Sequence, residues 1–223
     1  MSVSTDPGAA APAAAPVNGS RAHRPAPRGW LLLAVTLLVG VLLGGGLGIL
    51  VPHLRTPGDD SVEAGFLRDM STHHAQAVEM SMIVHAGSDN PEIITLSSDI
   101  ALTQHGQIGY MQAWLRDWNL SPTGSQPPMA WMPNSAGAVV NGLMPGMATP
   151  EQLATLRKAT GNNLDVQFLT LMRAHHLGGI HMAQEALDLS DDKNVDWLAQ
   201  QMVAGQQSEL GLIDSLLKEL QPA

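Results

Sequence analysis

Two stretches that combine paired histidines with methionines carry the residues of this chain best suited to chemistry. FLRDMSTHHAQAVEM runs from Phe66 to Met80, and FLTLMRAHHLGGIHM runs from Phe168 to Met182. A shift of 102 residues, which takes Phe66 onto Phe168, aligns the two without a gap and identifies an internal repeat. Thioether sulfur is a soft ligand that selects Cu(I), and imidazole also suits copper. The pattern therefore points to metal binding, with copper favoured.

Helical periodicity places the whole pattern on one face of each helix. At about 100° per residue, the histidines and methionines of the first stretch fall in one sector about 140° wide, which is also the apolar sector. The charged residues at positions 68, 69 and 79 fall outside it. The second stretch repeats this arrangement, so the sequence predicts eight inward-facing candidate metal ligands: Met70, His73, His74, Met80, Met172, His175, His176 and Met182.

Polar partners for these histidines come from the helices that follow each stretch. Gln104 and Gln107 lie three residues apart, and so do Gln206 and Glu209, so each pair shares one helix face. A purely structural role is therefore an alternative, in which the histidines are hydrogen-bonded core groups and the methionines are flexible core filler. The duplication of the whole set favours metal binding. Secondary candidates around such a site are His85, Gln104, Gln206 and Glu209.

Two Met-x-x-Met spacings lie in the segment between the repeats. Met129 and Met132 flank Trp131, and Met144 and Met147 enclose a Pro-Gly pair. Two interpretations stay open for these four methionines. They would be exposed sites of copper capture, as further secondary candidates, or they would pack onto the bundle as a hydrophobic cap.

The periodic elements beyond residue 60 form two helical hairpins. In the first hairpin, Asn90 is the expected cap of the second helix, and Pro91 is its first helical residue. Between the hairpins, a capping box at Thr149 begins a short helix that Gly161 is expected to stop. Hairpins that bury each other's apolar faces predict an all-α fold, a four-helix bundle. The expected organisation of residues 60–220 is repeat one at 61–118, a Met-rich connection at 119–161 and repeat two at 162–220.

An apolar segment precedes the bundle. WLLLAVTLLVGVLLGGGLGILV, residues 30–51, holds 22 residues without a charge, and about 20 apolar residues span a bilayer. Arginines precede it and acidic residues follow it, which places the N-terminus in the cytoplasm. We expect a disordered cytoplasmic tail at 1–29, a single-pass anchor in the cell membrane at 30–51, and an extracytoplasmic C-terminal domain. A cleaved signal peptide is the alternative.

Composition excludes several classes of function. The chain has no cysteine, so disulfides and thiolate metal sites are ruled out. With 20 acidic and 11 basic residues, it is a poor nucleic-acid binder. A di-iron bundle would need Glu-x-x-His motifs, which are absent from the sequence. No nucleophile with its base and no phosphate-binding loop is visible, so we expect a protein that is not an enzyme.

The duplicated motif, with MPGMATPEQL before its second copy, resembles the DUF305 family over about residues 60–220. This resemblance implies an exported, ferritin-like four-helix bundle, and some members of the family bind copper. It also implies that the eight inward residues are the ligands. The first hairpin departs from the family pattern because Gln107 stands where Glu is expected, while Glu209 keeps the pattern in the second. Because of this departure, the two halves are not expected to bind metal equally.

The function expected from all this is that of a membrane-anchored extracytoplasmic protein that sequesters or transfers Cu(I). Its partners would be the metal ion and, through the N-terminal helix, the membrane. A non-catalytic accessory subunit of a membrane complex, such as a respiratory one, is the alternative. Gly40, Gly44 and Gly48 motivate that alternative, because small residues at this spacing favour packing between transmembrane helices. A metal-dependent redox enzyme is the least favoured hypothesis.

Overall fold

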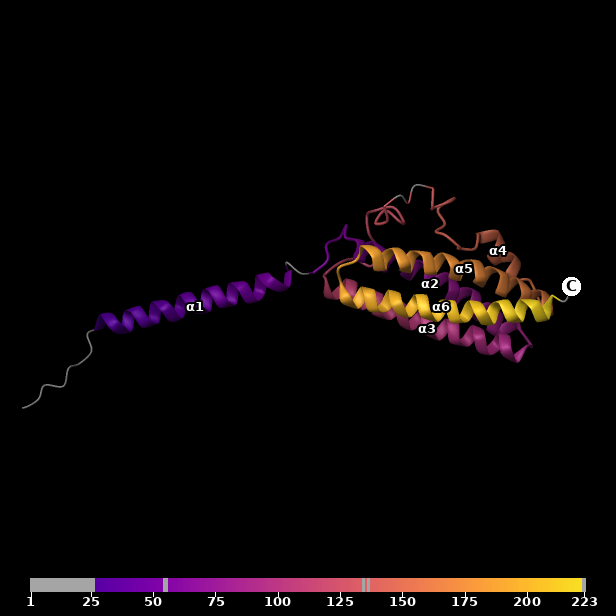
Figure 1. Ribbon diagram of the computed structural model, residues 1–223, viewed down its shortest axis with the longest axis horizontal. Coiled ribbons are helices and arrows are strands. Elements are labelled where there is room, and N and C mark those ends of the chain that lie inside the picture. Colours follow the sequence, from indigo (N-terminus) through magenta and orange to yellow (C-terminus); the bar gives the residue numbers. More distant parts are fainter. Residues whose placement is uncertain (1–26, 54–55, 134, 136, 222–223) are drawn as a thin grey trace, which may run out of the picture. The chain divides into compact units, whose positions relative to one another are not determined.

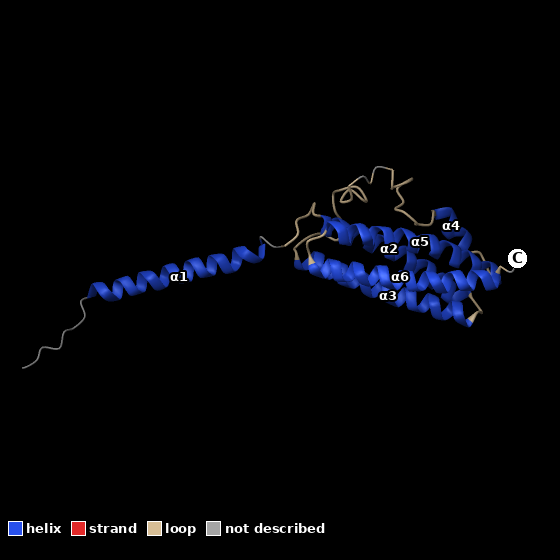
Figure 2. Cartoon of the chain, viewed as in Figure 1, coloured by secondary structure: helices blue, strands red, loops and turns tan. Residues whose placement is uncertain are grey.

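The computed structural model describes residues 27–53, 56–133, 135 and 137–221, and every regular element among them is a helix (Figure 1, Figure 2). The predicted all-α class is therefore confirmed. The six helices are α1 (Pro27–His53), α2 (Val62–Gly87), α3 (Pro91–Asp117), α4 (Pro150–Leu156), α5 (Gly161–Leu189) and α6 (Lys193–Leu220). The chain divides into two compact units, Met1–Arg55 and Thr56–Ala223.

The first unit contains α1, an apolar helix. Its segment Gly29–Gly46 is long and apolar enough to cross a membrane, and none of that segment is buried. A signal sequence would have the same properties. The helix begins at Pro27, three residues before the expected start, because a proline is well accommodated in the first turn of a helix. Most of the expected tail, residues 1–26, lies outside the described residues.

The second unit is a bundle of two hairpins. Helix α2 packs against α3, α5 packs against α6, and the hairpins meet where α2 contacts α5, with α4 touching both. The sequence positions these elements through their first turns. Asn90 caps α3 with Pro91 at its first position, and Thr149 forms a capping box with Gln152 at α4, as predicted.

One predicted boundary is wrong. Gly161 was expected to stop α4, but α4 ends at Leu156 and Gly161 is the first residue of α5. The chain leaves the helix through turns in which the Lys158 and Ala159 amides bond back to Thr155. Gly161 then has φ +55°, a left-handed conformation that favours glycine, so its role is to start the following helix in a new direction.

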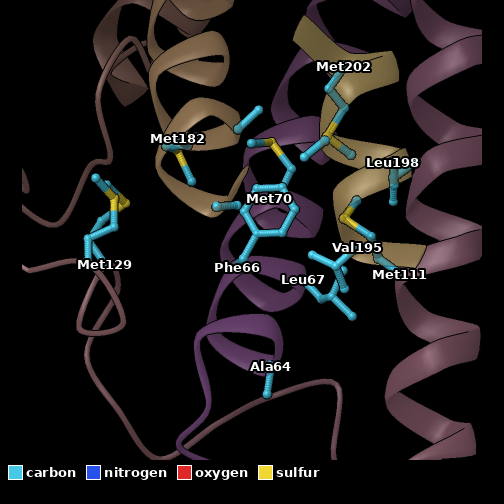
Figure 3. Close-up of a cluster of buried hydrophobic side chains, with 14 of the residues drawn as sticks. Ala64, Phe66, Leu67, Met70, Met111, Met129, Met182, Val195, Leu198 and Met202 are labelled. Carbon is cyan, nitrogen blue, oxygen red and sulfur yellow. The ribbon is translucent and has the colours of Figure 1, made fainter. Parts of the chain in front are cut away.

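Buried side chains form two clusters along the bundle. The first core cluster contains seven buried methionines together with Phe66, Leu67, Val195 and Leu198 (Figure 3). The second core cluster contains Met80 and Met172 with mainly aliphatic neighbours and Phe168. The methionines of the first core cluster are Met70, Met111, Met129, Met132, Met144, Met182 and Met202.

Candidate metal centre

The four paired histidines form a buried polar layer where the two hairpins meet. His73, His74 and His176 are completely buried, and His175 is 1% exposed. The rings of His73 and His175, which occupy equivalent places in the two repeats, lie with their centroids 3.8 Å apart and their planes inclined by 35°. The prediction that the pairs face inward is therefore correct.

The inner histidines are held by backbone carbonyl groups. His73 Nε2 lies 3.0 Å from the carbonyl oxygen of Pro145, in the connection between the repeats. His175 Nε2 lies 3.0 Å from the carbonyl oxygen of His73 itself, so the two hairpins are joined at this point. Because a carbonyl oxygen only accepts, Nε2 is the protonated nitrogen in both rings.

The outer histidines are held by side chains of the partner helices. His74 Nε2 lies 2.7 Å from Gln107 Oε1, and His176 Nε2 lies 2.5 Å from Glu209 Oε2. Both bonds join residues that are 33 positions apart, so the two repeats have equivalent hydrogen bonds as well as similar sequences. The amide and carboxylate oxygens accept, which again places the hydrogen on Nε2.

The other ring nitrogen, Nδ1, is buried without a hydrogen-bond partner in all four histidines, among the residues that the structure describes. Burial lowers the pKa of His73 to about 4 and of His74 to about 3, and it lowers the pKa of His175 well below its ordinary value. These three rings are therefore neutral at pH 7, and a neutral ring protonated at Nε2 carries a free lone pair on Nδ1. A ring fixed through one N–H with the other nitrogen free is the arrangement found in metal-binding histidines.

The four predicted methionine ligands flank this layer in two pairs. Met70 and Met182 belong to the first core cluster and Met80 and Met172 to the second, so each repeat supplies one thioether to each side. All four are completely buried. No three histidine, cysteine or carboxylate side chains among the described residues could hold an ion together. The thioethers are the other buried donor atoms beside the layer, and thioether sulfur suits a soft ion such as Cu(I).

Two methionines that the sequence analysis missed lie close to this set. Met111 on α3 and Met202 on α6 belong to the same buried cluster as Met70 and Met182, as Figure 3 shows. Neither is repeated, because Ile213 and Ile100 stand at the equivalent positions. Without the repeat, nothing in the sequence separates them from ordinary core residues.

The secondary candidates differ in their placement. Gln104 and Gln206 are buried, and each has an amide oxygen without a partner among the described residues. Glu209 holds His176. His85, which was predicted to share the inward sector, is exposed near the end of α2 and pairs with Ser98. Polar groups in the first turns of α3 hold the ring outside the core, because His85 Nδ1 lies 3.0 Å from Ser98 Oγ and 3.4 Å from the Ile94 carbonyl oxygen.

The connection covers the histidine layer and is fastened differently to the two repeats. The side-chain amide of Gln76 exchanges two hydrogen bonds with the backbone of Ala148. At the equivalent position in α5, a side chain on Gly178 would place its Cβ 1.9 Å from the Pro145 oxygen. A glycine is thus required for the connection to lie against α5, and this contact positions the carbonyl that His73 uses.

The loop methionines belong to this cover. Met129, Met132 and Met144 are buried in the first core cluster, and Met147 packs against it partly buried. They form a hydrophobic cap and are not the exposed capture sites of the other interpretation. The reason is the docking of the connection, since Asp69 Oδ2 accepts hydrogen bonds from the Met129 amide at 2.6 Å and from Trp131 Nε1 at 2.9 Å.

Fold and site together define a four-helix bundle made of two histidine- and methionine-bearing hairpins. The model of the DUF305 domain, a domain of unknown function, matches residues 63–217, and the chain belongs to this family. A DUF305 protein from Streptomyces coelicolor has a similar crystal structure, with 44% identity, a TM-score of 0.67, and coverage of 73% of this chain and 96% of that one. A DUF305 fragment from Deinococcus radiodurans is 29% identical, with a TM-score of 0.59 and coverage of 71% and 96%.

A third solved structure is the protein CopM in its Cu(II)-bound form. It is 22% identical to this chain, has a TM-score of 0.56, and the match covers 72% of this chain and 98% of CopM. At this identity the similarity concerns the fold. No functionally curated protein matches the chain in sequence.

Proposed function

We propose that this protein binds Cu(I) as cargo, through the buried histidine layer and the methionines beside it, and sequesters or transfers the ion. The observation that carries the proposal is the set of four Nδ1 atoms without partners, each on a ring whose Nε2 is already held. Leaving a buried polar atom unpaired costs about 1–3 kcal/mol. Four such atoms in a duplicated arrangement are better explained by a ligand than by packing.

The relatives support this assignment. CopM has been solved with Cu(II), with Cu(I) and with silver, and its fold is that of the present bundle. Silver(I) and Cu(I) are both soft ions that favour thioether ligands. The donors in this chain, neutral imidazole and thioether, are of the same chemical kind. Binding and release of an ion, without chemical turnover, is the role that such a donor set supports.

The proposal includes a location outside the cytoplasm. The relative from Streptomyces coelicolor is designated a secreted protein. In this chain α1 would either anchor the bundle to the membrane or direct its export. Cu(I) would reach the bundle from the extracytoplasmic side in both cases.

The test is an anaerobic competition titration of residues 56–223 with Cu(I) and a chromophoric chelator. These residues form a compact unit of their own, so they can be studied without α1. The double variant His74→Gln/His176→Gln should weaken binding at least about tenfold, since it removes two Nδ1 donors. His181→Gln, which changes an exposed histidine on α5, is the matched control and should bind like the parent.

A second pair of variants examines the sulfur ligands. Met70→Leu/Met182→Leu removes two buried thioethers at nearly constant volume, and Met82→Leu removes one that is 54% exposed on α2. Only the first should weaken Cu(I) binding. If neither histidine nor methionine variants alter the affinity, the proposal is wrong, and the role of accessory subunit becomes the better hypothesis.

A further inference from the structure

The two repeats contain equivalent half-sites that differ in one hydrogen-bond acceptor. Half-site one is His74 with Gln107, and half-site two is His176 with Glu209. Both rings are completely buried, both bonds run from Nε2, and both Nδ1 atoms have no partner among the described residues. The acceptor is a neutral amide in half-site one and a carboxylate in half-site two.

We propose that the half-sites fill in a fixed order, half-site two before half-site one, because Glu209 supplies a negative charge where Gln107 supplies none. This inference rests on the proposed Cu(I) binding and adds an order to it. The inner histidines supply no such difference in charge, since both His73 and His175 bond through Nε2 to uncharged backbone carbonyl groups.

The physical reason lies in the second layer of the site. A carboxylate that accepts the Nε2 hydrogen bond increases electron donation from the opposite ring nitrogen, and exchanging such partners typically changes metal affinity 10- to 100-fold. A buried cation also needs a compensating negative charge close by. Half-site two provides that charge one imidazole ring away from the ion, whereas Gln107 leaves the ion of half-site one without it. Half-site one is then the more readily emptied of the two.

The structure also permits a clean exchange of the two acceptors. The side chain of Glu209 is 21% exposed, and Gln107 is likewise partly exposed, so moving the carboxylate from one place to the other does not bury it completely. Other differences between the repeats, such as Gln76 against Gly178, remain in place after the exchange. If they determined the order, the exchange would leave it unchanged.

The experiment is a titration of residues 56–223 with Ag(I), a soft, diamagnetic and air-stable probe, followed by NMR of the histidine side-chain nitrogens. In the parent, the His176 signals should shift with the first equivalent and the His74 signals afterwards, with affinities that differ about 10- to 100-fold. In Gln107→Glu/Glu209→Gln the order should reverse. In Gln107→Glu alone, both half-sites should fill together.

Two outcomes overturn the inference: simultaneous filling in the parent, or an unchanged order in the exchanged double variant. Failure of the proposed function looks different, because no histidine signal would then respond to Ag(I) at all. Amide spectra and thermal unfolding of each variant confirm that the bundle is intact. Glu209→Gln serves as the comparison in which half-site two should weaken to the level of half-site one.

Discussion

Burial of neutral histidines makes the stability of this bundle depend on pH in a defined direction. Burial holds the pKa of His73 at about 4 and that of His74 at about 3, against an ordinary value of 6.5, and it also lowers the pKa of His175. At a pH between the pKa of a histidine in the folded protein and its pKa in the unfolded chain, the unfolded chain binds more protons than the folded one. The contribution to stability is therefore complete above about pH 6.5 and is lost as the pH falls toward 4.

The magnitude follows from the proton linkage relation. For one histidine with an unfolded pKa of 6.5 and a folded pKa of about 4 or lower, lowering the pH from 7 to 5 reduces the free energy of unfolding by about 2 kcal/mol. His73 and His74 together give about 4 kcal/mol, and His175 acts in the same direction. This is a large part of the stability of many domains, about 5–15 kcal/mol.

The assay is urea unfolding of metal-free residues 56–223 at pH 7 and pH 5. His74→Gln should lose about 2 kcal/mol of the pH dependence seen in the parent, and His181→Gln, with its exposed ring, should lose none. If His74→Gln keeps the full pH dependence, the ring is not buried in a neutral form and the description of the layer is wrong.

Two further predictions concern the docking of the connection. Gly178→Ala should release the connection from α5, which would lower the melting temperature and speed proteolysis between residues 119 and 148. Gly205→Ala is the control, because a Cβ at this helical position meets nothing within 4 Å. It should stabilise the bundle by about 1 kcal/mol. Equal melting temperatures for the two variants would contradict the contact with Pro145. Asp69→Ala removes the acceptor of two hydrogen bonds, from Met129 and Trp131, and should cost about 2–4 kcal/mol in urea unfolding; a loss below 1 kcal/mol would show that these bonds contribute little.

The sequence predicted the bundle and the inward direction of the histidines because both depend on periodicity. The 102-residue shift aligned His73 with His175, and the same symmetry brings their rings together in the structure. Gln107 and Glu209 could be recognised as partners because they lie on the faces of α3 and α6 that meet the histidines. Local capping residues such as Asn90 fixed the helix starts.

The connection could not be predicted in this way, because its contacts follow no period. Arg68 and Asp69 fall outside the apolar sector, yet Arg68 is only 9% exposed and donates to the Ser121 carbonyl oxygen, while Asp69 holds Met129. These bonds join residues more than 50 positions apart. For the same reason the burial of the loop methionines, and the use of Pro145 by His73, emerged only from the structure.

The most direct test of the central claim is Cu K-edge X-ray absorption on residues 56–223 loaded with one equivalent of Cu(I). The site described here predicts a coordination shell of mixed imidazole nitrogen and thioether sulfur, with sulfur scattering reduced in Met70→Leu/Met182→Leu. A shell of nitrogen and oxygen alone would contradict the methionine assignment. A spectrum unchanged in His74→Gln/His176→Gln would contradict the histidine layer as the binding site.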